Sequence, residues 1–144
     1  MNSPPYEKAI KIYREKVIEK FRPRSIILFG SIATGKYRAW SDIDILVISE
    51  NLPENFLERL RILFELNPTM APIEALGYTP TEFIQMLKRR HPTALYAMAD
   101  GKPIYDDGFF TEAKGVFEQI KAKFDLVRVE HGWNAKALTS KALA

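Results

Sequence analysis

Two short apolar runs constrain the fold more than any other feature of the sequence. Residues 25–29 read SIILF and are closed by Gly30, and residues 42–48 read DIDILVI and are rich in β-branched side chains. Apolar runs of this length suit buried strands better than buried helices. The sequence therefore predicts two neighbouring strands in the interior of the molecule.

Amphipathic helical patterns surround these strands. The first predicted helix begins at residues 3–5 and ends at Arg22-Pro23, and the next begins at Pro53 and stops at Asn67-Pro68. Residues 79–82 read Thr-Pro-Thr-Glu, a capping sequence that predicts a helix start. Residues 92–100 predict a short helix, and a last long helix follows. The predicted inward-facing residues are Tyr6, Ile10, Tyr13, Val17, Phe21, Phe56, Leu60, Leu63, Phe64, Phe83, Met86, Leu87, Ala113, Phe117, Ile120, Phe124 and Val127.

Two further strands are predicted at about residues 70–78 and at residues 102–105. Helices that alternate with three to four strands indicate an α/β (α+β) fold, a small sheet covered by helices on at least one face. The 144 residues, 47% of them hydrophobic, suffice for one core. We expect residues 1–130 to form a single domain and residues 131–144 to form a C-terminal tail, a frayed helix.

Composition excludes several classes of protein. The chain has no cysteine, so disulfide scaffolds and thiolate chemistry are excluded. The formal charge of +3 favours phosphate-bearing ligands but gives no strong nucleic-acid signal. The first residues are polar, and no apolar run approaches the roughly 20 residues that span a bilayer. These features predict a soluble, cytoplasmic protein with no membrane partner.

Asp42 and Asp44 are the strongest candidates for chemistry. Side chains on a strand alternate between faces, so these two carboxylates point the same way while Ile43 and Ile45 point the other way. Two negative charges at one end of an apolar strand repel each other and are costly to desolvate. A bound divalent cation would remove this cost, and Mg²⁺ prefers carboxylate and phosphate oxygens. The pair predicts a site that handles phosphate.

Gly30 and Ser31 lie at the turn between the first strand and a short helical segment within residues 31–38. Glycine permits a tight turn and the close approach of backbone amides to an anion, and Ser31 adds a hydroxyl donor. Ten residues separate Ser31 from Asp42, enough for a short helix and a return into the neighbouring strand. A phosphate and a metal ion could therefore meet at one edge of the sheet.

The segment FGSIATGKYRAWSDIDILV, residues 29–47, resembles the signature of the polymerase-β-type nucleotidyltransferase superfamily, a Gly-Ser pair followed after ten residues by Asp-x-Asp. In size the chain is similar to the minimal nucleotidyltransferase (MNT) family. A weaker likeness extends through residues 72–83 to residues 101–107. The resemblance implies the nucleotidyltransferase fold, with a small mixed β-sheet flanked by helices.

The resemblance also implies a mechanism. Asp42 and Asp44 would hold two Mg²⁺ ions, and Glu74, at the position of the family's third carboxylate, would complete one metal site and help to deprotonate the acceptor. The family more commonly has aspartate at this third position. Nucleoside monophosphate, AMP from ATP, would move to an acceptor hydroxyl on a helical HEPN-type protein, the partner in a toxin–antitoxin pair.

Three other interpretations compete with this one. Gly30 to Lys36 also fits the start of a P-loop, but Tyr37 stands where that motif requires serine or threonine. The chain could be a nucleotide- or partner-binding module that kept the fold and lost turnover, with Glu74 as the first suspect. It could also be a surface adaptor whose acidic cluster is incidental. Sequence alone leaves the base preference, the acceptor and the oligomeric state open.

Overall fold

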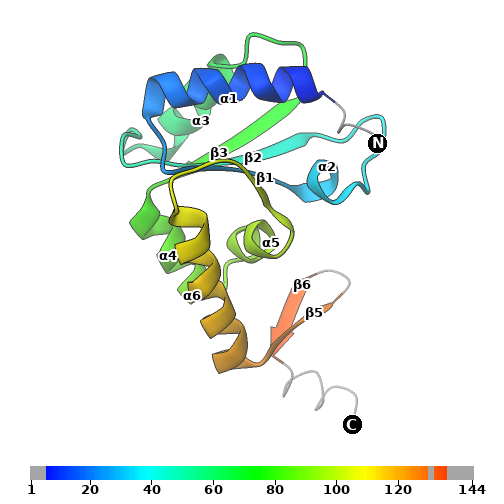
Figure 1. The fold of residues 1–144 in the computed structure, drawn as a ribbon, viewed down its shortest axis with the longest axis vertical. Coiled ribbons are helices and arrows are strands. Elements are labelled where there is room, and N and C mark those ends of the chain that lie inside the picture. Colours follow the sequence, from blue (N-terminus) through cyan, green and yellow to red (C-terminus); the bar gives the residue numbers. More distant parts are fainter. Residues whose placement is uncertain (1–5, 130–131, 136–144) are drawn as a thin grey trace.

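The computed structural model describes residues 6–129 and 132–135 and builds them around a sheet of four strands (Figure 1). The helices are α1 (Glu7–Phe21), α2 (Gly30–Thr34), α3 (Phe56–Glu65), α4 (Pro80–Lys88), α5 (Pro92–Asp100) and α6 (Phe109–Phe124). The strands are β1 (Ser25–Phe29), β2 (Ile43–Ile48), β3 (Ile73–Tyr78), β4 (Lys102–Asp106), β5 (Leu126–Val129) and β6 (Gly132–Ala135). In the described part of the chain, each helix is too short or too polar to cross a bilayer.

The main sheet has the order β3-β2-β1-β4. Strand β1 runs antiparallel to β2 and to β4, whereas β2 and β3 run parallel. The predicted α/β class and the predicted mixed sheet flanked by helices are therefore confirmed. The two strands predicted from the apolar runs, β1 and β2, are the two central strands of the sheet. A central strand has neighbours on both edges and helices over both faces, so nearly all of its side chains are buried and its sequence is apolar throughout.

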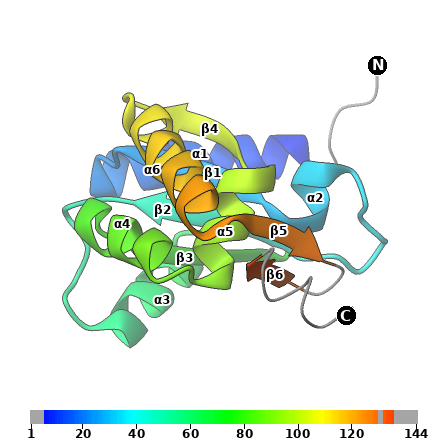
Figure 2. The same cartoon turned by 90° about the horizontal axis from the view of Figure 1, so that it is seen from below.

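Helices cover both faces of this sheet. Helices α1 and α3 pack on one face, and α4, α5 and α6 pack on the other (Figures 1 and 2). Alternation along β2 divides its residues between the two cores: Ile43, Ile45 and Val47 contact the α1 side, and Leu46 and Ile48 contact the α4–α6 side. By the same alternation, Asp44 belongs to the α4–α6 face, at the end of the sheet where β2 begins.

Helix α3 departs from the prediction. It begins at Phe56 rather than at Pro53, and of the predicted apolar stripe Phe64 is 76% exposed. Arg59, in contrast, is buried, and its side chain donates to the carbonyl oxygens of Pro53 (2.5 Å) and Gly77 (3.3 Å). Its guanidinium also donates to Glu82, at 2.7 and 3.3 Å. Periodicity that counts only apolar residues misses an arginine whose donors are satisfied inside the protein.

Helix α4 starts as predicted, through a capping box in which Thr79 and Glu82 each bond the other's backbone N–H. Helix α5 and β1 have the predicted bounds. Strand β3 begins at Ile73 rather than near Met70, which is fully exposed. Outside the sheet, the helix start predicted at residues 3–5 falls outside the described residues, and Tyr6 caps α1 instead of joining its buried stripe.

The C-terminal prediction is wrong for residues 126–129 and 132–135. Helix α6 ends at Phe124, because Asp125 adopts a left-handed conformation (φ 50°), and Val127 belongs to a strand. Strands β5 and β6 pair antiparallel as a separate two-stranded sheet. Residues 132–135 are therefore a strand and no part of a frayed helix, while residues 136–144 lie outside the description. The domain boundary at residue 130 stays a prediction, although this pairing runs across it.

Candidate active site at the carboxylate edge of the sheet

Two of the predicted carboxylates lie on adjacent strands. Asp44 is the second residue of β2, and its register partners are Phe29 on β1 and Glu74 on β3. Residues in register on neighbouring strands project from the same face of a sheet, so the side chains of Asp44 and Glu74 lie side by side. Together with Phe29, Leu76 and Thr93 they line a small cavity of about 210 Å³.

Asp42 lies two residues before Asp44, just outside the strand, and is exposed. Its charge still reaches the site. Partial burial and, to a smaller extent, the negative charges of Glu74 and then Asp42 together raise the pKa of Asp44 to about 6. The negative charges of Glu74 and Asp42 therefore act on Asp44, which is the half-buried member of the three.

Within residues 6–129 and 132–135, no three acidic or histidine side chains converge tightly enough to form a ready-made metal site. The donor set nevertheless fits a hard divalent cation, because it consists of carboxylates whose mutual repulsion already perturbs Asp44. Glu74 and Asp42 are both exposed, so their side chains have room to change rotamer around a bound ion.

Residue 30 must be a glycine because its backbone lies directly against the side chain of Asp44. It has a φ of 74°, a conformation that L-residues rarely adopt, and a Cβ atom at this position would overlap Asp44 Oδ2. The turn after β1 can therefore pass directly against the carboxylate only because residue 30 has no side chain. Ser31, the next residue, is half-buried in the first turn of α2. The structure thus brings Gly30 and Ser31 to the same edge as Asp44 and Glu74.

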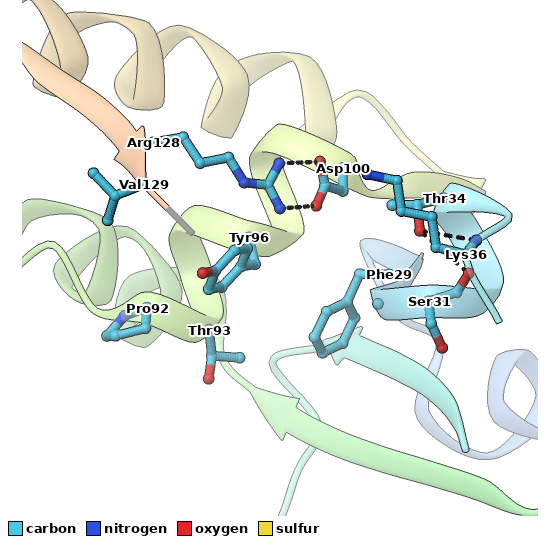
Figure 3. Close-up of a pocket in the computed structure, with 11 residues that line it drawn as sticks. Phe29, Ser31, Thr34, Lys36, Pro92, Thr93, Tyr96, Asp100, Arg128 and Val129 are labelled. Atoms are coloured by element: carbon cyan, nitrogen blue, oxygen red, sulfur yellow. Dashed lines mark hydrogen bonds and ion pairs between the residues drawn. The ribbon is translucent and has the colours of Figure 1, made fainter. Parts of the chain in front are cut away.

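A larger cavity of about 850 Å³ adjoins this edge (Figure 3). It shares Phe29 and Thr93 with the small cavity. One side of it comes from the α2 segment and the other from α5 and β5. The lining residues are Phe29, Gly30, Ser31, Thr34, Lys36, Pro92, Thr93, Tyr96, Asp100, Arg128 and Val129.

The residues of α5 and β5 that line this cavity were not predicted from the sequence as part of the site. Arg128 forms a two-pronged ion pair with Asp100, with both N–O distances 2.6 Å, and its guanidinium lies 4.9 Å from the ring centre of Tyr96. The β-branched residues Val127 and Val129 on either side of Arg128 were a signal for a strand. No local pattern indicates that this strand reaches Asp100, 28 residues earlier in the chain.

Residues 10–91 match the family model described as Nucleotidyltransferase domain. The match covers more than half of the chain, and the chain belongs to this family. The predicted class of enzyme, a nucleotidyltransferase, and the superfamily resemblance are therefore confirmed.

Two curated proteins of Methanocaldococcus jannaschii are similar to one segment of the chain, and both carry the name Putative protein adenylyltransferase. MJ1305 is 48% identical over 42 residues, which is 29% of this chain and 29% of that protein. MJ0604 is 50% identical over 46 residues, 31% of this chain and 46% of that protein. The matched segment thus spans less than half the length of either relative.

Among solved structures, a toxin–antitoxin structure with AMP-PNP has a similar fold. The TM-score is 0.52 at 19% identity, over 97% of this chain and 99% of the other. A likeness at this level of identity concerns the fold alone. It agrees with the mixed sheet and the helical layers described above.

Proposed function

We propose that this protein is a magnesium-dependent nucleotidyltransferase that moves AMP from ATP to a hydroxyl group of an acceptor. The observation that carries the proposal is the register of β2 and β3, which sets Asp44 beside Glu74 at the edge where Gly30 turns. Membership of the nucleotidyltransferase domain family supports it.

In this proposal Asp42, Asp44 and Glu74 would hold the metal. Two Mg²⁺ ions bound there would neutralise the triphosphate and stabilise the departing pyrophosphate. The chain's own contribution is to hold carboxylates of suitable type on two rigid strands, next to a turn whose backbone approaches them closely. Ser31 would donate its hydroxyl to a phosphate oxygen from the start of α2.

The acceptor oxygen would attack the α-phosphorus in line with the bond to the leaving group. As the new P–O bond forms, the bond to the oxygen that bridges the α- and β-phosphates breaks, and pyrophosphate departs. The acceptor proton passes to a carboxylate, and Glu74 is suited to receive it because it is exposed at the mouth of the small cavity. Asp44 lies deeper and is better suited to the metal.

We further propose that the acceptor is a protein and that a helical HEPN-type toxin is the partner. Two observations support a protein acceptor: both curated relatives carry the name of a protein adenylyltransferase, and the solved structure with a similar fold is a toxin–antitoxin structure. In such a pair the transferred AMP would modify the toxin.

The test is label transfer from ATP carrying ³²P on the α-phosphate. The full-length protein is incubated with this ATP, MgCl₂ and a candidate HEPN-type protein, and label on the acceptor is followed on a denaturing gel. Asp42→Ala and Asp44→Ala are expected to lower transfer by at least about 10²-fold, because the metal ligands act in the transition state. Glu19→Ala, an exposed carboxylate on α1, is the matched control.

Three outcomes separate the hypotheses. Transfer that needs Mg²⁺ and both aspartates supports the enzyme. Binding of ATP without transfer to any acceptor would contradict it and would support the nucleotide-binding module. An Asp44→Ala variant as active as the Glu19→Ala control would contradict the site itself.

A further inference from the structure

The larger cavity has a wall that the proposed chemistry does not use. This wall is formed by α5 and by β5, the strand that pairs with β6 in a hairpin, on the side opposite the α2 segment (Figure 3). Arg128 joins its two parts: it pairs with Asp100 at the end of α5 and lies over the rings of Tyr96 (4.9 Å) and Trp133 (5.8 Å). Trp133 packs edge-on against Phe117 of α6 at 5.9 Å, which anchors the hairpin.

We infer that this wall binds the base and ribose of the nucleotide, with Tyr96 as the stacking surface and Arg128 as the residue that holds it in position. The inference rests on the proposed nucleotide transfer and adds residues to that site.

The size of the two cavities favours this arrangement. The cavity beside Asp44 and Glu74, at about 210 Å³, is smaller than the roughly 300–1,000 Å³ of sites that enclose an organic ligand. The larger cavity, at about 850 Å³, lies within that range. Because the two share Phe29 and Thr93, a nucleotide with its α-phosphate at the carboxylates would extend its base into the larger cavity.

The two sides of the larger cavity also differ in the kind of side chain that lines them. Ser31 and Lys36 on its α2 side carry a hydroxyl and a positive charge, which suit phosphate oxygens. On the other side the half-buried ring of Tyr96 faces the hollow, and the ring of Phe29 borders the same hollow (Figure 3). Aromatic rings suit the flat surface of a base.

In the inferred site Arg128 acts by holding the ring of Tyr96 in place, and its charge does not bind the phosphates. Both prongs of its guanidinium are engaged by the carboxylate of Asp100, whose side chain is only 16% exposed. An arginine held in this way is unavailable as a phosphate ligand, but it fixes the ring of Tyr96 on which it lies. Loss of Arg128 should therefore weaken binding of the nucleoside part and leave binding of the phosphates unchanged.

The experiment compares two probes, the ATP analogue AMP-PNP and inorganic tripolyphosphate, by calorimetric titration of the full chain with MgCl₂ present. Tyr96→Ala and Arg128→Ala are each expected to raise the Kd for the analogue about tenfold, as loss of one base–aromatic stack does. The Kd for tripolyphosphate should stay within about twofold. Arg61→Ala is the control, an exposed arginine on α3 that also pairs with two carboxylates, Glu58 and Glu65.

Tyr96→Leu and Asp100→Asn keep the test decisive if a truncation to alanine unfolds the hairpin. Leucine keeps an apolar side chain at residue 96 without the aromatic ring, and asparagine keeps the shape of Asp100 without the charge that pairs with Arg128. An unchanged Kd for the analogue in folded Tyr96 and Arg128 variants would overturn the inference. An equal loss of affinity for both probes would also overturn it, because the wall would then act on the phosphates. Wild-type protein that binds neither probe would instead refute the proposed function.

Discussion

Replacing Asp44 by asparagine should stabilise the metal-free protein at neutral pH while it removes activity. Asp44 is half-buried, and its pKa is raised from 3.8 to about 6, by burial first and then by Glu74 and Asp42. Its ionised form is therefore disfavoured in the folded chain. Asparagine has nearly the same shape and carries no charge, so the substitution removes this cost without creating a cavity.

The sign and size follow from proton linkage. Below pH 3.8 the carboxyl is protonated in both the folded and the unfolded chain, so Asp44 costs nothing. Between 3.8 and about 6 the folded chain binds more protons, and stability falls as the pH rises. Above about 6 the penalty is complete. A shift of roughly two pKa units corresponds to about 3 kcal/mol, which solvent screening of a half-exposed group reduces to about 1–2 kcal/mol.

The measurement is urea unfolding of wild type and Asp44→Asn in EDTA. At about pH 7.5 the variant should be more stable by about 1–2 kcal/mol, and by about pH 4 most of this difference should vanish. Mg²⁺ with AMP-PNP should stabilise the wild type and have little effect on the variant, since a ligand stabilises only a state that binds it. Glu19→Gln, an exposed carboxylate on α1, is the control and should change stability little at either pH.

Two results would refute this reasoning. The first is an Asp44→Asn variant that is less stable than wild type at neutral pH, which would mean that the carboxylate is stabilised in the folded chain. The second is a gain of equal size at both pH values, which would assign the effect to packing rather than to charge.

Two further substitutions test how the site and the fold are held. Gly30→Ala should abolish AMP transfer, because the added Cβ would displace the carboxylate of Asp44. Gly35 also has a positive φ but open space around it, so Gly35→Ala should keep activity and cost only about 1–2 kcal/mol of stability. Equal AMP transfer by the two variants would contradict the steric explanation. Arg59→Ala should lower the free energy of unfolding by about 2–3 kcal/mol, because it leaves buried carbonyl acceptors unpaired, and the exposed Arg61→Ala should lose much less in the same urea titration.

Local sequence patterns determined much of this protein. The apolar runs specified β1 and β2, and the Thr79–Glu82 capping box specified the start of α4, because each depends only on neighbours within a few residues. The two-residue spacing of Asp42 and Asp44 likewise predicts that both carboxylates lie on one face of the sheet. Together with the preceding Gly-Ser pair, this spacing was enough to indicate the family.

Only the tertiary structure decided what stands next to these residues. The parallel pairing of β3 with β2 puts Glu74 beside Asp44, and a strand's partner and register depend on contacts between distant segments. Arg59 is buried and Phe64 is exposed, which apolar periodicity did not predict, because the donors of Arg59 reach the carbonyl oxygens of Pro53 and Gly77. The hairpin that reaches α5 through Arg128 is a further case, since an ion pair between residues 28 positions apart leaves no mark on local periodicity.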